Sequence, residues 1–519
     1  MVDPRAAAIA RRAAELAGAL GVDLGDDLRL FALAGGRPDV APVAGEPDEL
    51  GRMLEAATPG ARRLREGVHY TPAAMAAELV ERSWPASGLP SVGDPACGGG
   101  ALLLAAGRRL LDAGATPAQA LRRLWGADID PLAVATTEAA LTLWAGTSVP
   151  EGQLVVADAL LDDLRWPPLD VVVGNPPFLG QLATTTASDR PRAAALRARF
   201  GDAVQAYTDP AGLFLLLAVE LGGSGSRVGM VLPQSLLGAR DAAALRTVIG
   251  SSARILDLWV PDERFDAAVD VCLVVLERGA AGDDRPWTAH LARRLSVPMV
   301  ELDGPQTVGD RATVMASFRQ EYYGLLPGLA EASAAPTGRP LVTTGRLDLG
   351  SISDRPTRVG RRSWAAPVVL LDRVDGRAQQ WIDRTAVPKL LVATQTKVVE
   401  VAVDADGATV PLTPIIAVAA PPDELWPLAA ALASPPVSAW AAARVAGTAL
   451  SAGALRLTAP LVRSVPLPTH PEAWEIGTTA FRAGDLAAFA AAMTAAYEAD
   501  PEVIAWWQPR AEPVWSPRG

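Results

Sequence analysis

The stretch Ser91-Val92-Gly93-Asp94-Pro95-Ala96-Cys97-Gly98-Gly99-Gly100 decides the fold, because it joins a short apolar strand to a glycine turn. A helix is expected directly afterwards, over 101–111. Glycine lets the backbone turn sharply and approach a ligand closely. A strand, a glycine turn and a helix together therefore predict a ligand site at the end of a strand. A glycine cluster also occurs in ordinary loops, so this interpretation depends on the surrounding sequence.

Strands and helices alternate after this turn. Helices that alternate with apolar strands favour a mostly parallel sheet with helices on both faces. The last two strands have a short connection and should pair antiparallel. The expected fold class is α/β, with a Rossmann-like, mostly parallel seven-stranded sheet whose last strand is antiparallel. Strands are expected at 124–129, 154–156, 169–173, 228–232, 255–260 and 269–276, and helices at 131–144, 211–221 and 239–249.

Three segments are predicted along the 519 residues. Residues 1–66 carry apolar side chains at helical spacing and should form an N-terminal helical segment. Residues 67–285 hold the sheet. Residues 286–519 lose the alternation and are expected to form an irregular α+β domain. Its predicted helices, before a tail rich in Pro and Trp, are 425–432, 436–445 and 485–497.

The composition excludes several classes of protein. Hydrophobic residues make up 50% and charged residues 20%, as in a folded protein rather than a disordered one. No apolar stretch is long enough to span a membrane, and the start of the chain lacks the pattern of a signal peptide, so a cytoplasmic location is expected. Two cysteines and three widely spaced histidines form no zinc pattern, and no metal is expected.

An acidic residue ends the second strand, where Asp128 stands in Gly126-Ala127-Asp128-Ile129. An acidic side chain at such a strand end can accept hydrogen bonds from ribose hydroxyls. The sequence has neither a Gly-x-Gly-x-x-Gly fingerprint nor a Walker phosphate loop. This pattern predicts a nucleoside-containing cofactor other than a nicotinamide dinucleotide or ATP.

The tetrapeptide Asn175-Pro176-Pro177-Phe178 follows the apolar strand 169–173. Asn-Pro is also a common turn signal. The chemistry nevertheless suits methylation of an exocyclic amine, whose lone pair is delocalised into its ring. The Asn175 side-chain oxygen and the Pro176 carbonyl could accept the hydrogens of the amine and favour a tetrahedral nitrogen, and the two prolines would fix the direction of that carbonyl.

The stretch from Tyr70 to Leu276 resembles the class I S-adenosylmethionine-dependent methyltransferases, specifically the adenine-specific DNA N6-methyltransferases of restriction-modification or phage-defence systems. Gly67–Pro72 is similar to the methionine-binding motif of that group, and Asp94–Gly100 to its glycine motif, with Gly99 in place of a serine. The resemblance implies S-adenosyl-L-methionine as cofactor. The cofactor-binding residues that it implies are Tyr70, Thr71, Pro72, Asp94, Ala96, Gly98, Gly100, Asp128, Ile129, Asp158 and Ala159.

The same resemblance implies Asn175, Pro176, Pro177 and Phe178 as the catalytic residues. A base inside a duplex cannot reach such a pocket, so the target adenine would be flipped out of the helix. Phe178 is expected to stack on it. Phe265 stands where the family carries a second aromatic side chain for the other face of the base, although a core position at a strand end is an equal alternative.

Double-stranded DNA is the expected partner. Pro340–Asp348, Pro388–Val392 and the segment from Leu455 to Pro468 resemble landmarks of a target-recognition domain. The stretch Arg339–Lys397 holds eleven Arg or Lys and five Asp, a net charge of +6 within a chain of −11. A local basic stretch of this kind indicates a surface that faces DNA. For Trp364 and Trp381, within the stretch, a core position and a contact with DNA are equal alternatives.

Two other functions stay open. The Asn-Pro-Pro-aromatic motif is shared with protein glutamine methyltransferases, which are much shorter. The chain could also be a DNA-binding modification subunit that needs other subunits of a restriction-modification or defence system. No Asp…Glu-x-Lys nuclease pattern is found, so a modification enzyme without a nuclease domain is expected.

Overall fold

The computed structural model describes residues 3–58, 70–178, 190–205, 208–261, 270–279, 282, 285–317, 319–448 and 454–515. The chain forms two compact units, Met1–Arg285 (unit 1) and Pro286–Gly519 (unit 2). Each unit is described by itself. Within the described ranges, no helix combines the length and the apolar character that a membrane crossing requires.

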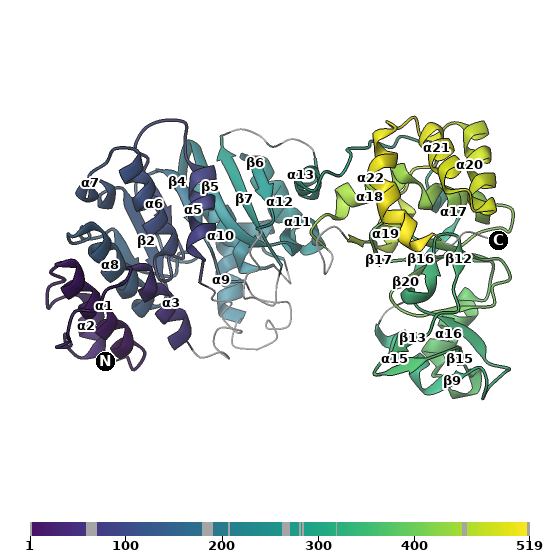
Figure 1. The fold of residues 1–519 in the computed structure, drawn as a ribbon, viewed down its shortest axis with the longest axis horizontal. Coiled ribbons are helices and arrows are strands. Elements are labelled where there is room, and N and C mark those ends of the chain that lie inside the picture. Colours follow the sequence, from purple (N-terminus) through teal and green to yellow (C-terminus); the bar gives the residue numbers. More distant parts are fainter. Residues whose placement is uncertain are drawn as a thin grey trace. The chain divides into compact units, whose positions relative to one another are not determined.

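Unit 1 is built on a seven-stranded sheet with the order β3-β2-β1-β4-β5-β7-β6 (Figure 1). The first five strands in this order pair in parallel, and β7 runs antiparallel to both of its neighbours. The predicted fold class is confirmed, including the antiparallel last strand. The strands are β1 Val92–Asp94, β2 Leu124–Asp128, β3 Leu154–Val156, β4 Leu169–Gly174, β5 Gly222–Pro233, β6 Ala253–Trp259 and β7 Val271–Arg278.

Helices flank this sheet at the positions that the apolar spacing predicts. Helix α8 begins after Asp130, which caps it through the Leu132 N–H, and ends at Gly146 in the left-handed conformation. The helix expected over 239–249 is divided into the 3₁₀ turn η3 and α12. The main helices are α1 Ala6–Leu20, α2 Arg29–Ala34, α3 Asp48–Ala57, α5 Ala73–Ser83, α6 Ala101–Asp112, α7 Pro117–Leu121, α8 Pro131–Ala145, α9 Arg190–Phe200, α10 Pro210–Leu221, η3 Arg240–Ala242 and α12 Ala243–Gly250.

Unit 2 contains two four-stranded sheets, in the orders β19-β10-β15-β9 and β18-β16-β20-β8, and three two-stranded ribbons. The expected irregular α+β character is confirmed. The sheet strands are β8 Thr313–Ala316, β9 Leu329–Glu331, β10 Arg339–Val342, β15 Pro367–Val369, β16 Lys389–Ala393, β18 Val401–Asp404, β19 Val410–Pro411 and β20 Ile415–Ala419. The ribbon strands are β11 Leu347–Asp348, β12 Ser351–Ile352, β13 Thr357–Val359, β14 Arg362–Trp364, β17 Gln395–Thr396 and β21 Leu455–Arg456.

The three helices predicted in unit 2 are present, but the prediction of a tail after residue 497 is wrong. Residues Glu502–Ala511 form helix α22, because Trp507 is fully buried with its ring 5.9 Å from that of Phe489. The aromatic residues of the supposed tail therefore belong to a core. The main helices are α13 Trp287–Arg294, α15 Arg319–Leu325, α16 Gly376–Thr385, α17 Leu425–Ala433, α18 Pro435–Val445, α20 Pro471–Ala483, α21 Leu486–Ala496 and α22.

Candidate active site

The carboxyl ends of β1, β2 and β4 lie side by side, because β1 pairs in parallel with both of the other strands. Asp94 is the last residue of β1, Asp128 is the last residue of β2, and Asn175 directly follows β4. Ligands of parallel α/β sheets bind beyond this edge. The sheet topology therefore brings the predicted cofactor residues and the predicted catalytic residues to one edge.

The glycine turn after β1 has the backbone shape that a ligand cradle requires. Gly98 has a φ of 51° and Gly100 a φ of 84°, both in the left-handed region that favours glycine. The Cys97 N–H donates to the Ala127 carbonyl at 2.9 Å, which fixes the turn to β2. A Cβ atom at Gly98 would meet no heavy atom within 4 Å. The turn is therefore rigidly attached to the sheet and faces open space at Gly98.

Gly99 is in contact with the N-terminal helices. A Cβ atom at Gly99 would lie 2.4 Å from the Cα of Gly51 in α3. A Cβ atom at Gly51 would in turn lie 2.8 Å from the Tyr70 ring. The serine of the related motif could not be accommodated here without a shift of backbone, so this departure from the family pattern follows from the packing of α3 onto the turn.

A buried carboxyl group and a half-buried one lie beside the turn. Asp94 is 1% exposed, and burial raises its pKa to about 8, although its Oδ1 accepts the Ala96 N–H at 3.0 Å. Burial also raises the pKa of Asp128 to about 6, although its Oδ2 accepts the Gly98 N–H at 3.0 Å. Within the described part of the chain, neither carboxylate forms an ion pair. A ligand that donates hydrogen bonds or carries a positive charge would stabilise the ionised form of these two carboxyl groups.

An apolar surface and a further carboxylate lie along the same edge. Ile129, after β2, is 65% exposed, and Val156, at the end of β3, is 49% exposed. A flat, apolar ligand group would cover these side chains. Asp158 is bound by Arg192 of α9, whose Nη2 lies 3.2 Å from the Asp158 Oδ1. The neighbouring Ala159 is buried, and its carbonyl accepts a hydrogen bond from the Arg199 Nη1 at 3.2 Å.

The N-terminal helices also hold the loop after β2 through an ion pair that sequence reasoning missed. Arg5 Nη1 lies 2.7 Å from Asp130 Oδ2, and Arg5 Nη2 lies 3.1 Å from Asp130 Oδ1. Asp130 therefore caps α8 and binds Arg5 at the same time. The two residues are 125 positions apart, and nothing in the local sequence of either one identifies the other.

Asn175 is held by Thr71, which the sequence predicted only as a cofactor residue. The Asn175 Nδ2 donates to the Thr71 Oγ1 at 2.9 Å, and Thr71 is 5% exposed. This bond ties the Asn175 amide to the segment before α5. Asn175 is the only asparagine in the chain.

The rest of the tetrapeptide packs closely at the end of β4. Pro176 and Phe178 are buried, with Phe178 4% exposed, and Pro177 is half-buried. Phe178 therefore has little ring surface open to a base in this structure. Phe265 lies outside the described residues, as do Gly67, Val68 and His69 of the predicted methionine-binding motif. Tyr70 and Pro72 are described and lie directly beside Thr71, before α5.

Comparison with known proteins agrees with this geometry. Residues 52–284 match the family model of the N-6 DNA methylases. The segment is an N-6 DNA methylase domain. The predicted family is confirmed, and the matched residues contain the strand-end edge and the Asn175 tetrapeptide. No curated protein matches the chain in sequence.

Solved structures resemble the methylase domain together with unit 2. The type IIL restriction-modification enzyme MmeI in complex with DNA matches with 13% identity over 94% of this chain and 81% of that chain, with a TM-score of 0.60. The type IIG restriction endonuclease BpuSI matches with 13% identity over 92% and 72%, with a TM-score of 0.47. A modification subunit of a putative type I restriction enzyme from Vibrio vulnificus YJ016 matches with 21% identity over 52% and 61%, with a TM-score of 0.37. The likeness to MmeI shows a shared fold.

Beyond the methylase domain, the basic stretch Arg339–Lys397 divides into buried and exposed cations. Lys389 is fully buried and pairs with Asp404, which is 6% exposed. Arg346 is 7% exposed, and its Nε donates to the Ser353 carbonyl at 2.9 Å. These cations hold unit 2 together, so the net charge of +6 overstates what reaches the surface. The exposed cations of the stretch are Arg355, Arg358, Arg361, Arg362, Arg373, Arg377, Arg384 and Lys397.

The two tryptophans of the stretch are core residues. Trp364 is 7% exposed and Trp381 is fully buried, and both belong to one apolar cluster of unit 2. The Trp381 Nε1 donates to the Pro411 carbonyl at 2.9 Å. Of the two alternatives for these side chains, the core position is confirmed.

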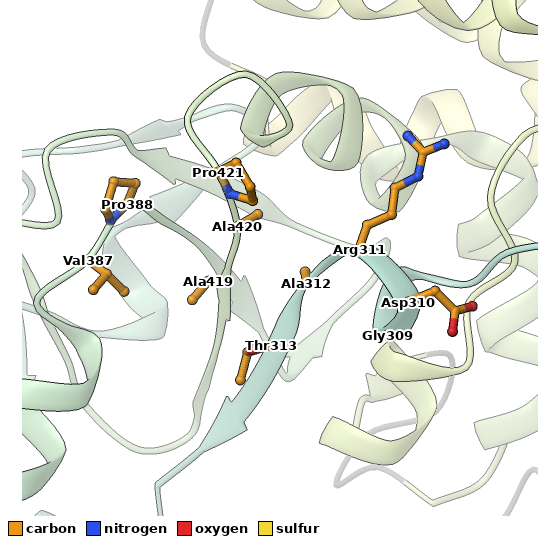
Figure 2. A pocket seen from close by; sticks show the side chains of 10 residues that line it. All are labelled: Gly309, Asp310, Arg311, Ala312, Thr313, Val387, Pro388, Ala419, Ala420 and Pro421. Atoms are coloured by element: carbon orange, nitrogen blue, oxygen red, sulfur yellow. The ribbon is translucent and has the colours of Figure 1, made fainter.

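Unit 2 also contains a hollow of about 480 Å³ beside the start of β8 (Figure 2). Asp310 and Arg311 are the charged residues of its lining. Asp310 accepts the Thr307 N–H at 2.7 Å, and the Arg311 Nε donates to the Gln306 Oε1 at 3.0 Å. Both charged groups are thus engaged by unit 2 itself. In the described part of the chain no group of His, Cys, Asp and Glu could hold a metal ion. The strand-end edge of the methylase domain is the candidate active site.

Proposed function

We propose that this chain transfers a methyl group from S-adenosylmethionine to the exocyclic N6 amine of adenine, within a specific sequence of duplex DNA. The observation that carries the proposal is the position of Asn175-Pro176 at the end of β4, beside the glycine turn at the end of β1. With the proposed roles, this arrangement would set an amine-binding group next to a cofactor-binding turn. The match of residues 52–284 to the N-6 DNA methylases supports the same chemistry.

The chemistry of the strand-end edge fits the cofactor. Asp128 would accept hydrogen bonds from the ribose hydroxyls, and Asp94 would lie near the methionine ammonium group. Ile129 offers an apolar face to the adenine ring, and Asp158 an acceptor to its amine. The bound cofactor supplies a methyl group on an electrophilic sulfonium sulfur. We assign to the same site the residues Tyr70, Thr71, Pro72, Ala96, Gly98, Gly100 and Ala159.

The protein groups act on the amine of the substrate. The Asn175 Oδ1 and the Pro176 carbonyl would accept its two hydrogens, which draws the nitrogen away from the plane of the ring. Thr71 preorganises the acceptor, because its hydroxyl already holds the Asn175 Nδ2. The amine nitrogen would then bond to the methyl carbon while the carbon–sulfur bond breaks, which leaves a neutral thioether, and the methylated amine would release one proton to water. Alignment of the amine should provide most of the rate acceleration.

The target adenine must leave the duplex to reach this edge. We propose that Phe178 and Phe265 stack on its two faces, which would contribute roughly 1–3 kcal/mol for each stacked face. Since Phe178 is buried in this structure, its ring would have to be uncovered when the base enters. We assign residues 286–519 to target recognition, and residues 1–66 and 67–285 to the N-terminal helical segment and the methyltransferase domain.

The test is methyl transfer from S-adenosylmethionine labelled with tritium in the methyl group. Label is expected in duplex DNA, and N6-methyladenine on hydrolysis of that DNA. Asn175→Ala should lower turnover at least about 100-fold while the affinity for S-adenosylmethionine stays unchanged. Retained turnover in this variant would sink the proposal. Label in protein instead of DNA would favour a glutamine methyltransferase, and activity that appears only with a co-expressed subunit would identify a partner-dependent enzyme.

A further inference from the structure

We infer that the β13–β14 hairpin of unit 2 contacts the duplex DNA through Arg358, Arg361 and Arg362. This inference rests on the proposed function, and it names the element by which the chain would hold its substrate. The eleven cations of the basic stretch are not equivalent in the structure. Several are buried or paired, whereas these three are exposed on one short ribbon.

The hairpin is a short ribbon that is held against the rest of unit 2. Its strands pair Thr357 with Trp364 and Val359 with Arg362, which leaves Gly360 and Arg361 as a two-residue turn. Gly360 has a φ of 63°, and a positive φ at the first turn residue is typical of the tight hairpin turns that match the twist of the strands. The Gly360 N–H donates to the Tyr322 hydroxyl of α15 at 3.2 Å. The tip is therefore fixed to the body of unit 2.

The two faces of the hairpin differ. Thr357, Val359 and Trp364 are buried, the last two within the apolar cluster of unit 2. Arg358 pairs with Ser363 on the opposite face, and both of these residues are exposed. Side chains alternate between the faces of a strand, so this pattern attaches one face to the core and turns Arg358 outward. Arg362 pairs with Val359 on the core-facing side, but its side chain is exposed and lies over the Trp364 ring. Figure 1 shows β13 beside α15.

The arginines of the hairpin are available to an anion. Among the described residues, neither Arg358 nor Arg361 forms an ion pair. The Arg362 guanidinium lies 4.5 Å from the centre of the Trp364 ring, which orients it without neutralising its charge. The carboxylate of Glu331, whose oxygens accept the Ala365 and Ala366 N–H groups at 2.9 Å each, interacts electrostatically with Arg362. Arg358 and Arg361 thus carry positive charge without an ion-pair partner among the described residues.

Charge complementarity and shape identify the occupant as a duplex nucleic acid. Arginine binds phosphate in a bidentate manner, and a two-stranded ribbon fits the major groove of B-DNA. In a chain with a net charge of −11, most of the surface repels such a polyanion. The hairpin should therefore supply a large share of the attraction.

By contrast, the neighbouring cation Arg355 already forms an ion pair within unit 2. Its Nη2 lies 2.6 Å from the Oδ1 of Asp348, which is 2% exposed. The exposed cations Arg373, Arg384 and Lys397 lie on other elements of the basic stretch. They provide a matched control with the same loss of three positive charges.

The experiment measures binding of the full chain to a fluorescent, mixed-sequence duplex over a range of salt concentrations. The hairpin variant is Arg358→Gln/Arg361→Gln/Arg362→Gln, and the control is Arg373→Gln/Arg384→Gln/Lys397→Gln. We expect the hairpin variant to bind at least about tenfold more weakly, with a salt slope that is shallower by about 0.9 for each lost phosphate contact. The control should lose about twofold or less. Circular dichroism and thermal unfolding verify that both variants are folded.

Equal weakening in both variants would overturn the inference, because diffuse charge would then explain binding. Unchanged binding of the hairpin variant would also overturn the inference about the hairpin. The proposed function would survive that result if the intact chain binds and methylates DNA. If the intact chain neither binds nor methylates duplex DNA, both proposals fail. Binding and methylation by the intact chain together with the selective loss in the hairpin variant support both.

Discussion

Charged groups are buried in both units, but in opposite ways. In unit 1, Asp94 and Asp128 lie beside an open glycine turn, and burial raises the pKa of both carboxyls. In unit 2, burial alone would raise the pKa of Asp404, but Lys389 and Thr409 hold it below its ordinary value. A buried charge that its own unit pairs is structural. To the carboxyl groups beside open space, held by backbone N–H groups, we assign a role in binding a ligand.

The same contrast separates the cations of unit 2 from one another. Lys389 is fully buried and serves the sheet, whereas Arg358 and Arg361 are exposed on a hairpin. Counting charges along the sequence treats all three alike. Their different environments predict different consequences when each is removed.

The largest effect is expected for Lys389→Ala. The substitution leaves Asp404 buried without its cation, so the free energy of unfolding should fall by about 3–5 kcal/mol. Urea denaturation measures this change. Arg358→Ala, at an exposed site in the same basic stretch, should alter stability by less than about 0.5 kcal/mol.

A double variant sharpens this prediction. Lys389→Met/Asp404→Leu removes both charges and should recover part of the lost stability. Equal stability of Lys389→Ala and the unmodified chain would show that the pair is not a structural element.

The next effect concerns the contact between the glycine turn and α3. Gly99→Ala places a Cβ atom 2.4 Å from the Gly51 Cα, where backbone must move, so we expect a loss of about 1–3 kcal/mol in stability. Gly250→Ala is the control, because a Cβ atom there meets nothing within 4 Å. Chemical denaturation of both variants decides whether the turn depends on the N-terminal helices. Similar stabilities would contradict the packing of α3 onto the turn.

A smaller effect should separate two roles of Thr71. If its hydroxyl orients the Asn175 amide, Thr71→Val should lower kcat about tenfold, because it removes one hydrogen bond to a buried amide. Thr71→Ser keeps the hydroxyl and should restore most of the rate. The affinity for S-adenosylmethionine, measured by calorimetry, should change little in either variant. A loss of affinity with unchanged kcat would assign Thr71 to the cofactor alone.

The smallest effect is a pH dependence of cofactor binding. Ribose hydroxyls donate to an ionised carboxylate, and the pKa of Asp128 is raised to about 6. Lowering the pH through 6 protonates this carboxyl, so the affinity should fall by up to about tenfold for each pH unit below 6. This fall adds to the change between pH 6 and pH 8 that Asp94, with a pKa of about 8, would produce. Calorimetry over a range of roughly pH 5 to pH 8 measures how the affinity changes with pH. Asp128→Asn should lack this dependence, and a dependence that persists in it would belong to another group.

Much of unit 1 could be predicted from the sequence. The strands, the Rossmann-like sheet and the antiparallel last strand follow from apolar periodicity and from the lengths of connections, which are local properties. The strand-end positions of Asp94, Asp128 and Asn175 follow from the same pattern, because parallel strands all end at one edge. The roles of the site residues and the three domain boundaries stay predictions.

Unit 2 shows where local reasoning fails. Helix α22 was expected as a tail, because Pro and Trp are poor helix signals and the packing of Trp507 on Phe489 cannot be read from either neighbourhood. Helix α20 was not expected at all.

The sequence by itself determined the fold class of unit 1, the family of its domain and the edge where the candidate site lies. Only the tertiary structure decided that Thr71 holds the Asn175 amide, that Gly99 contacts Gly51, and which cations of the basic stretch are exposed. The physical reason is the range of the interactions. Periodicity and backbone conformation are encoded within a few residues, whereas burial and pairing depend on segments that meet only when the chain has folded.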